Sequence, residues 1–385
     1  MVMKVTVAID SFKGSLSSLE AGEGCREGIL EVFPEARVKV LELADGGEGT
    51  VRAIHSAGGE LFCTRVTGPI FEPVECEYSI SPDGMAVIEM AGAAGLTLVP
   101  EDKRDPRYTT TYGVGELIGE LIGRGVRRFT VGLGGSATND GGVGMLTALG
   151  FRFLNKGGRT VEPTAAGLGE LETIDPSGAI PELSECSFTV ASDVKNPLLG
   201  KSGASAVFAP QKGASEDAVS ELEGYLTRLA DKTAELFGVD KRDESGAGAA
   251  GGLGFAFISY LGARLESGIK IVSELIGLGD AIKESDIVVT GEGRLDGQSA
   301  MGKAPVGVAT VAKKYGKPCI ALAGSVKGST EELHELGLNA CFSITRGPAS
   351  LSECMDKRTA YGNIKAVAAE VFSLIRAMLG DRENV

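Results

Sequence analysis

Short apolar runs alternate with amphipathic helical segments at both ends of this 385-residue chain, and this alternation constrains its fold most. The predicted strands are Val5–Ile9, Val38–Leu43, Ile287–Thr290, Cys319–Ala323 and Cys341–Ile344. The predicted helices are Ser17–Phe33, Gly49–Ala57, Pro305–Tyr315, Thr330–Leu336 and about Asn363–Leu379. Strands that alternate with helices favour a parallel sheet covered by helices on its faces.

The middle of the chain follows a different pattern. Cys63–Thr67, Val74–Ser79 and Met85–Met90 alternate apolar and polar residues and are joined by turns, which predicts antiparallel strands. The length also suggests two domains. We therefore predict an α/β protein in which a discontinuous Rossmann-like parallel-sheet domain (residues 1–66 and 267–385) carries an inserted second α/β domain (residues 67–266). The active site is expected in the cleft between these domains.

Composition excludes several classes of function. The net charge of −14, the absence of Trp and an aromatic content of 5% disfavour nucleic-acid and acidic-membrane partners. The 7 Cys show no Cys-x-x-Cys spacing and the two His lie far apart, so no structural zinc site is expected. No apolar stretch is long enough to span a membrane, and the N-terminal segment reads as a strand rather than a signal peptide. The expected compartment is the cytoplasm.

Two polar turns follow the first two predicted strands, where ligands gather in open α/β sheets. In DSFKGSLS (10–17), Asp10, Ser11, Lys13 and Ser15 suit a carboxylate or a phosphate; the alternative is a capped helix with an exposed lysine. In ADGGEGT (44–50), the glycines let the backbone approach a ligand, and two acidic residues are suited to hold Mg²⁺ or substrate hydroxyls. The alternative for this second string is a tight turn with acids at a helix N-terminus.

The string GLGGSATNDGG (132–142) lies between a strand and an apolar helix. Small residues and hydroxyls in front of a helix form an amide nest for phosphates. The string is similar to the glycine-rich phosphate loop of the galactokinase–homoserine kinase superfamily but lacks the Pro upstream of that loop. The alternative is a glycine-rich turn that packs closely against its neighbours.

Two acidic strings supply candidates for a general base. GEGRLDGQS (291–299) is expected to leave the strand Ile287–Thr290, with Glu292 and Asp296 as base or metal ligand and Arg294 facing phosphoryl oxygens. SDVKNPLLGKSGA (192–204) follows a strand at Ser187–Ala191 and brings an acid and an amide from the second domain. Its alternative is an N-cap Asp and a turn.

Two further strings match nucleotide motifs only in part. The glycines 246, 248 and 251 match a dinucleotide fingerprint, but a polar segment precedes them where that fingerprint needs a strand. GQSAMGKA (297–304) is close to a P-loop, but Ala304 stands where the Mg²⁺-binding hydroxyl should be and the expected strand ends too early. Lys303 is still placed to face a phosphate.

Six strings in the same order closely resemble the bacterial glycerate kinase family of glyoxylate and glucarate–galactarate catabolism. They are DSFKGSLS, ADGGEGT, GLGGSATNDGG, SDVKNPLLG, GAGAAGGLG and TGEGRLDGQS. The resemblance runs nearly end to end. It implies ATP-dependent phosphorylation of D-glycerate with Mg²⁺, usually at the 2-hydroxyl, and a discontinuous Rossmann-like domain with an α/β insertion. The 2- and 3-phosphoglycerate products both stay open.

With this resemblance we assign candidate roles. The catalytic candidates are Asp296, Asp193 and Lys13. The substrate-binding candidates are Asp10, Ser11, Lys13, Ser15 and Arg294. The candidates for binding ATP are Gly46, Gly47, Gly49, Gly134, Gly135, Ser136, Thr138, Asn139 and Lys303. The Mg²⁺ candidates are Asp45, Glu48 and Glu292. The alternatives are an NAD-dependent hydroxy-acid oxidoreductase and a non-catalytic sugar-acid sensor. The oligomeric state is left open, a homodimer included.

Overall fold

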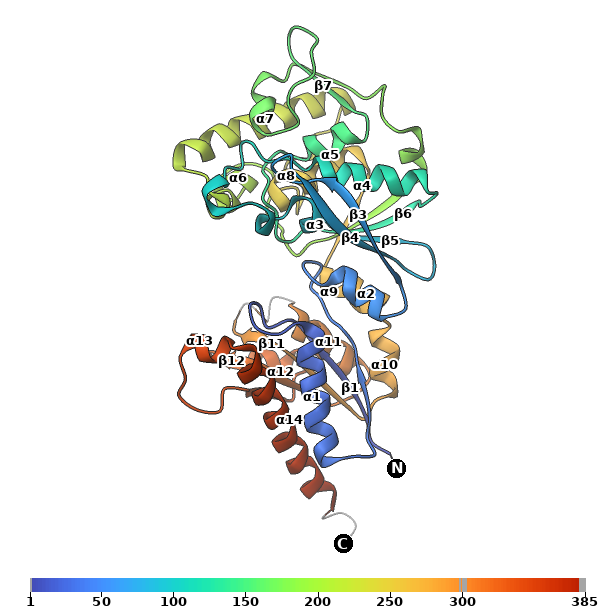
Figure 1. Cartoon of the computed structure of the whole chain (residues 1–385), viewed down its shortest axis with the longest axis vertical. Helices are drawn as coiled ribbons and strands as arrows, with labels where there is room; N and C mark the ends of the chain where they lie inside the picture. The colour runs from blue at the N-terminus through green and yellow to red at the C-terminus, as the bar shows by residue number, and fades with distance from the viewer. Residues whose placement is uncertain (1, 298, 300–302, 381–385) are drawn as a thin grey trace. The chain divides into compact units, whose positions relative to one another are not determined.

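The computed structural model describes residues 2–297, 299 and 303–380 (Figure 1). The chain divides into two compact units: unit 1 is Met1–Asp45 with Ile269–Val385, and unit 2 is Gly46–Gly268. The first division thus follows Asp45, whereas the domain change is predicted after residue 66. The reason is that the strand Glu60–Thr67 pairs along its whole length with the strand Pro73–Ile80 in unit 2. The domain ranges 1–66, 267–385 and 67–266 stay predictions.

Unit 1 contains a five-stranded parallel sheet. Its strands in spatial order are β13 (Ala340–Ser343), β12 (Cys319–Val326), β11 (Ile287–Leu295), β1 (Lys4–Ile9) and β2 (Arg37–Val40). Numbered within the unit, this is the doubly wound order 2-1-3-4-5 read from the other edge. In that order the strand sequence reverses between β1 and β11, which is the position where such sheets bind ligands.

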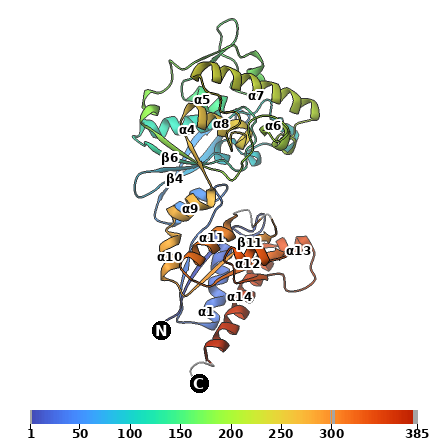
Figure 2. The same ribbon diagram turned by 180° about the vertical axis from the view of Figure 1, so that it is seen from behind.

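Alternation along β1 sends its side chains to two helical layers. Val5, Val7 and Ile9 join the core made by α1 (Ser18–Val32) and α14 (Lys357–Gly380), which lie side by side (Figure 1, Figure 2). Thr6 points the other way, and its hydroxyl donates to the carbonyl of Ala281 in α10 (Leu278–Glu284). The remaining helices of the unit are α9 (Gly268–Leu275), α11 (Ala304–Lys314), α12 (Glu331–Glu335) and α13 (Leu351–Met355).

Unit 2 contains a six-stranded mixed sheet. Its strands in spatial order are β10 (Arg264–Glu266), β9 (Ser187–Ala191), β6 (Arg128–Gly132), β5 (Ala86–Glu89), β4 (Pro73–Ile80) and β3 (Glu60–Thr67). The pairs β3–β4 and β4–β5 are antiparallel, as the alternating pattern predicted, and the other pairs are parallel. A short antiparallel pair joins β7 (Arg152–Leu154) and β8 (Thr173–Asp175). The mixed α/β architecture with parallel sheets confirms the predicted fold class.

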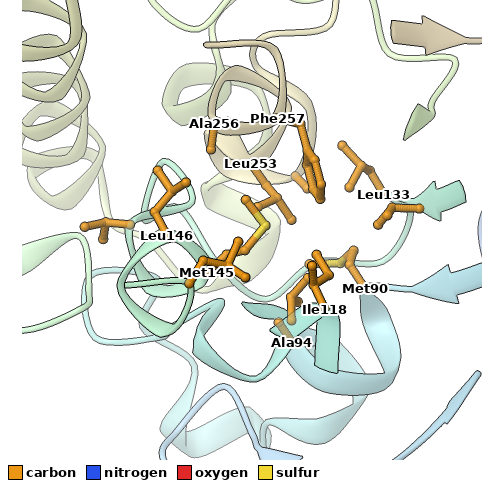
Figure 3. Packing of buried hydrophobic residues seen from close by; sticks show 14 of the residues in the cluster. Met90, Ala94, Ile118, Leu133, Met145, Leu146, Leu253, Ala256 and Phe257 are labelled. Atoms are coloured by element: carbon orange, nitrogen blue, oxygen red, sulfur yellow. The ribbon is translucent and has the colours of Figure 1, made fainter. Parts of the chain in front are cut away.

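The helices of unit 2 bury a large apolar core against this sheet. They are α2 (Thr50–Ser56), α3 (Ala91–Ala94), α4 (Tyr112–Gly123), α5 (Val143–Ala148), α6 (Ala204–Phe208), α7 (Glu216–Phe237) and α8 (Ala249–Tyr260). Met90, Met145, Leu253 and Phe257 meet in this core (Figure 3) and are fully buried. Close packing of α5 and α8 therefore fixes the loop that leads into α5.

The strand β11 is longer than predicted. Its ladder with β12 continues through Arg294 and Leu295, which pair with Ser325 and Val326. The segment from Gly291 to Leu295 is therefore strand and not loop, because β12 offers it a partner that the local sequence does not reveal. One reason for rejecting the P-loop match, an early strand end, is accordingly wrong. Residues 298 and 300–302 of that string lie outside the described residues.

Candidate functional site

A cavity of about 700 Å³ opens in unit 1 where β1, β11 and β12 end. Its walls come from the turn after β1, from the end of β11, from the end of β12 and from α13. Among the predicted site residues, those that line it are Asp10, Ser11, Lys13, Ser15, Asp45, Glu292, Arg294 and Lys303. The cavity lies at the reversal of strand order, and the Asp10 amide crosses that point to donate to the Gly291 carbonyl over 2.9 Å.

The turn after β1 presents hydrogen-bond donors to this cavity. Gly14 adopts φ +78°, a left-handed conformation that favours glycine. Among the described residues, the amides of Lys13 and Gly14 donate to no protein acceptor. The Ser15 hydroxyl is buried and has no hydrogen-bond partner. Buried polar groups normally have partners, so this turn is equipped for a ligand that accepts hydrogen bonds.

Burial and the acidic groups that line the same cavity raise the pKa of Asp10. Burial, and then the charge of Asp45, raises the pKa of Asp10 to about 7, and Asp10 is only 8% exposed. Burial also raises the pKa of Glu292, although its Oε1 accepts a 2.5 Å hydrogen bond from Ser299. The ammonium of Lys13 lies 3.8 Å from Asp45. This clustering of negative charge is relieved when a cation or a proton is present.

The predicted metal ligands are divided between the units. Asp45 and Glu292 line the cavity of unit 1, whereas Glu48 is an exposed residue of unit 2. No cluster of three or more His, Cys, Asp or Glu with metal-binding geometry occurs in the described ranges. Mg²⁺ is usually held by one or two carboxylates together with water and substrate phosphates, so two carboxylates fit this mode of binding.

The candidate bases also lie in different units. Asp296 follows β11, and its carboxylate lies 3.2 Å from Nε of Arg294. Asp193 follows β9 in unit 2 and is exposed. Asp193 is the second residue after β9, and Asp296 is the first residue after the lengthened β11.

The loop 132–142 of unit 2 connects β6 to α5. Among the described residues, six of its amides donate to no protein acceptor; they belong to Gly134, Gly135, Ser136, Thr138, Asn139 and Asp140. Thr138 and Asn139 are fully buried, and Oγ1 of Thr138 and Oδ1 of Asn139 also lack partners. A run of unpaired amides in front of a helix is an anion-binding arrangement.

The glycines of this loop also pack against the turn of unit 2 that begins at Gly46. A Cβ atom on Gly132 would overlap the carbonyl oxygen of Gly46, and one on Gly134 would lie 2.9 Å from the Cα of Gly47. The glycines 246–254 meet the same loop, because a Cβ on Gly251 would overlap the Thr138 carbonyl. No strand precedes them among the described residues, as predicted. They form a support for the loop rather than a dinucleotide site.

Three polar residues of unit 2 were not anticipated: Asp140 and Lys212 are buried, and Glu89 is half-buried. Asp140 accepts hydrogen bonds from Thr111 and from the amides of Gly142 and Gly144, and burial raises its pKa. Its place just before a helix is a capping signal that could have revealed it. Lys212 donates to Ser136 and Thr138 in the loop. No local pattern marks Lys212.

Glu89, at the end of β5, is the third of these residues. It accepts from the Val51 amide over 2.8 Å and so caps α2, whose N-cap residue Gly49 is left-handed. Burial raises the pKa of Glu89 to about 7. Gly49, a predicted ATP-binding residue, thus begins a helix that is capped by Glu89 from a strand distant in sequence.

None of the helices in the described part of the chain combines the length and apolarity of a membrane span.

Comparison with known proteins identifies relatives along nearly the whole chain. Residues 5–376 match the model of the glycerate kinase family. A glycerate kinase of Bacillus subtilis (strain 168) is 46% identical over 361 residues, 93% of this chain and 94% of the relative. A glycerate 2-kinase of Escherichia coli (strain K12) is 46% identical over 365 residues, 94% of this chain and 95% of the relative. A crystal structure of a glycerate kinase 2 candidate from Salmonella typhimurium LT2 superposes with a TM-score of 0.88 at 43% identity, covering 99% and 100% of the two chains.

Proposed function

Since the chain belongs to the glycerate kinase family, we propose that it transfers the γ-phosphoryl group of ATP to the 2-hydroxyl of D-glycerate. Membership of the family makes the chain a kinase enzyme and confirms the resemblance stated from its sequence. It also removes the oxidoreductase alternative. The E. coli relative that is 46% identical is named a glycerate 2-kinase, which supports the 2-phospho-D-glycerate product.

The observation that carries the proposal is the set of unpaired amides between Gly134 and Asn139, where the Ala137 amide alone donates to a protein carbonyl, that of Ala94. Phosphoryl transfer depends chiefly on positioning and on neutralising phosphate charge, and a backbone nest supplies both. We assign this loop, with the turn Gly46–Gly49, to the phosphates of ATP. Lys303 is assigned to a phosphate group because it lines the cavity of unit 1 as the N-cap residue of α11.

The turn after β1 is assigned to D-glycerate. Its carboxylate is a small anion that suits the amides of Lys13 and Gly14 and the ammonium of Lys13. Ser15 supplies a hydroxyl without a partner, and Asp10 and Ser11 line the same wall. Arg294 faces the cavity as a donor to phosphoryl oxygens.

Asp45 and Glu292 are proposed to hold Mg²⁺, with Glu48 as a further ligand. The raised pKa values of Asp10 and Glu292 support a cation here, since both arise partly from neighbouring carboxylates. When bound, Mg²⁺ neutralises charge on the transferred phosphate. The chain's own task is to orient the hydroxyl and accept its proton, and Asp296 or Asp193 is assigned that role.

The test is turnover of Asp296→Asn and Asp193→Asn, measured as ADP release with D-glycerate and Mg²⁺–ATP. The variant that lacks the true base should lose roughly 10²–10⁴-fold in kcat while its thermal stability stays near that of the wild type. Near-normal turnover in both variants would exclude both assignments. Phosphorus NMR of the product separates 2- from 3-phosphoglycerate. An absence of ADP above background, with glycerate still bound, would favour a sensor.

A further inference from the structure

We propose that Lys212 is a positioning residue that holds the phosphate loop 132–142 in the conformation that receives ATP. The proposal rests on the function proposed above for that loop. It concerns a residue far from the loop in sequence, at the end of the short 3₁₀ helix Pro210–Lys212.

The ammonium of Lys212 donates hydrogen bonds to two residues of the loop. Its Nζ donates to Oγ of Ser136 over 2.7 Å and to the carbonyl oxygen of Thr138 over 2.6 Å. One acceptor is a side chain and the other is main chain, so the lysine fixes both the rotamer of Ser136 and the direction of a peptide plane. When the Thr138 carbonyl is held by Lys212, the amide that follows it, that of Asn139, belongs to the same rigid peptide group.

The segment that carries Lys212 makes a second hydrogen bond with the loop. Nδ2 of Asn139 donates to Oγ of Ser205 over 3.0 Å, and Ser205 lies in α6, just before Lys212 in the chain. Ser205 and Lys212 are both buried. The loop residues 136–139 are thus tied to the segment 204–212, while the amides of Ser136, Thr138 and Asn139 have no acceptor in the described chain. Because the loop is held through side chains and a carbonyl, these amides stay available to a ligand.

Stability alone does not explain a lysine at this position. The side chain is 2% exposed, and burial lowers its pKa to about 7. An apolar side chain of similar volume usually costs less to bury than a charged one. The charge that opposes this shift is that of Asp140. The described contacts of the Asp140 carboxylate are with Thr111 and the first amides of α5, so Lys212 is not its hydrogen-bond partner.

The experiment measures KM for ATP, KM for D-glycerate, kcat and thermal unfolding for Lys212→Met, Lys212→Arg, Ser136→Ala and the double variant Lys212→Met/Ser136→Ala. Lys156→Met is the matched control, since Lys156 is an exposed lysine of the same unit. Lys212→Met should raise KM for ATP about 10- to 100-fold, the range of a lost charged hydrogen bond, with KM for glycerate within about twofold. Lys212→Arg should recover part of the loss. Adding Ser136→Ala to Lys212→Met should cost little more, because the two residues share one hydrogen bond.

The outcomes separate failure of this proposal from failure of the proposed function. If Ser136→Ala raises KM for ATP but Lys212→Met changes only the unfolding temperature, Lys212 is merely structural and the proposal is overturned. If neither variant changes KM for ATP while the wild type turns over normally, the loop is not the phosphate site, and the function assigned to it fails. If Lys212→Met does not fold, Lys212→Gln and Lys212→Arg are compared with the wild type in its place. A rise in both KM values together would also count against a role specific to ATP.

Discussion

A close approach between α4 and α5 in unit 2 provides a sharp test of the fold around the phosphate loop. Gly115 lies in α4 and faces Met145 of α5. A Cβ atom at Gly115 would overlap the Met145 carbonyl oxygen and would lie 2.8 Å from Cβ of Ala148. Because the overlapped atom belongs to the backbone, Gly115→Ala forces one helix to move.

The expected change in the free energy of unfolding of Gly115→Ala follows from two opposing effects. Replacing a helical glycine by alanine gains about 1 kcal/mol from helix propensity alone. Overpacking of a close contact costs typically about 1–3 kcal/mol, and an overlap with backbone belongs at the upper end. We expect Gly115→Ala to lower the free energy of unfolding by about 1–2 kcal/mol. Gly224→Ala, in α7 of the same unit, meets no atom within 4 Å and should gain about 1 kcal/mol.

The assay is urea unfolding followed by far-UV circular dichroism, since the chain has no Trp for fluorescence. Both glycines lie in unit 2, so the two variants should shift the midpoint of the same transition in opposite directions with an unchanged slope. If Gly115→Ala is as stable as Gly224→Ala, the helices do not cross as closely as described. The position of α5, and of the loop before it, would then need revision.

Two further predictions concern buried polar groups. Ser15→Ala should raise KM for D-glycerate about tenfold while leaving the unfolding temperature unchanged or higher, because the Ser15 hydroxyl has no protein partner to lose; an unchanged KM with lower stability would contradict this. The pKa of Lys212 is about 7 in the folded protein, below the value of about 10.4 in an unfolded chain, so the unfolded state binds more protons between these values. The free energy of unfolding should therefore rise with pH from about 7 to 10 in the wild type and rise less in Lys212→Met; equal slopes in urea titrations at pH 7 and 9.5 would refute the assignment.

Local patterns predicted the elements that neighbouring residues determine. The strand Ser187–Ala191 was predicted with its observed bounds, and Ser17 was placed at the start of α1, which it caps. The gathering of Asp10 and Glu292 at one cavity also followed from sequence, because strands of a parallel sheet end at a common edge. These features depend on periodicity and on sheet topology, and both can be read along the chain.

The features that were missed depend on partners distant in sequence. β11 continues to Leu295 because β12 extends alongside it, and nothing within Gly291–Leu295 signals that partner. Lys212 reaches Ser136 across the fold, and Glu89 caps a helix that precedes it in the chain. A single lysine or glutamate in a sequence does not show which distant donor or acceptor will meet it.

The glycine clusters serve two physical purposes that the sequence alone does not separate. Gly14 and Gly135 have left-handed conformations, so they shape the turns that expose amides. Gly132 and Gly134 instead allow one backbone to touch another at Gly46 and Gly47. A phosphate loop and a closely packed glycine turn were considered as alternatives for the string 132–142, yet the two descriptions are compatible. Close packing removes the freedom of the loop, and a loop without that freedom presents its unpaired amides to a ligand with less entropy still to lose.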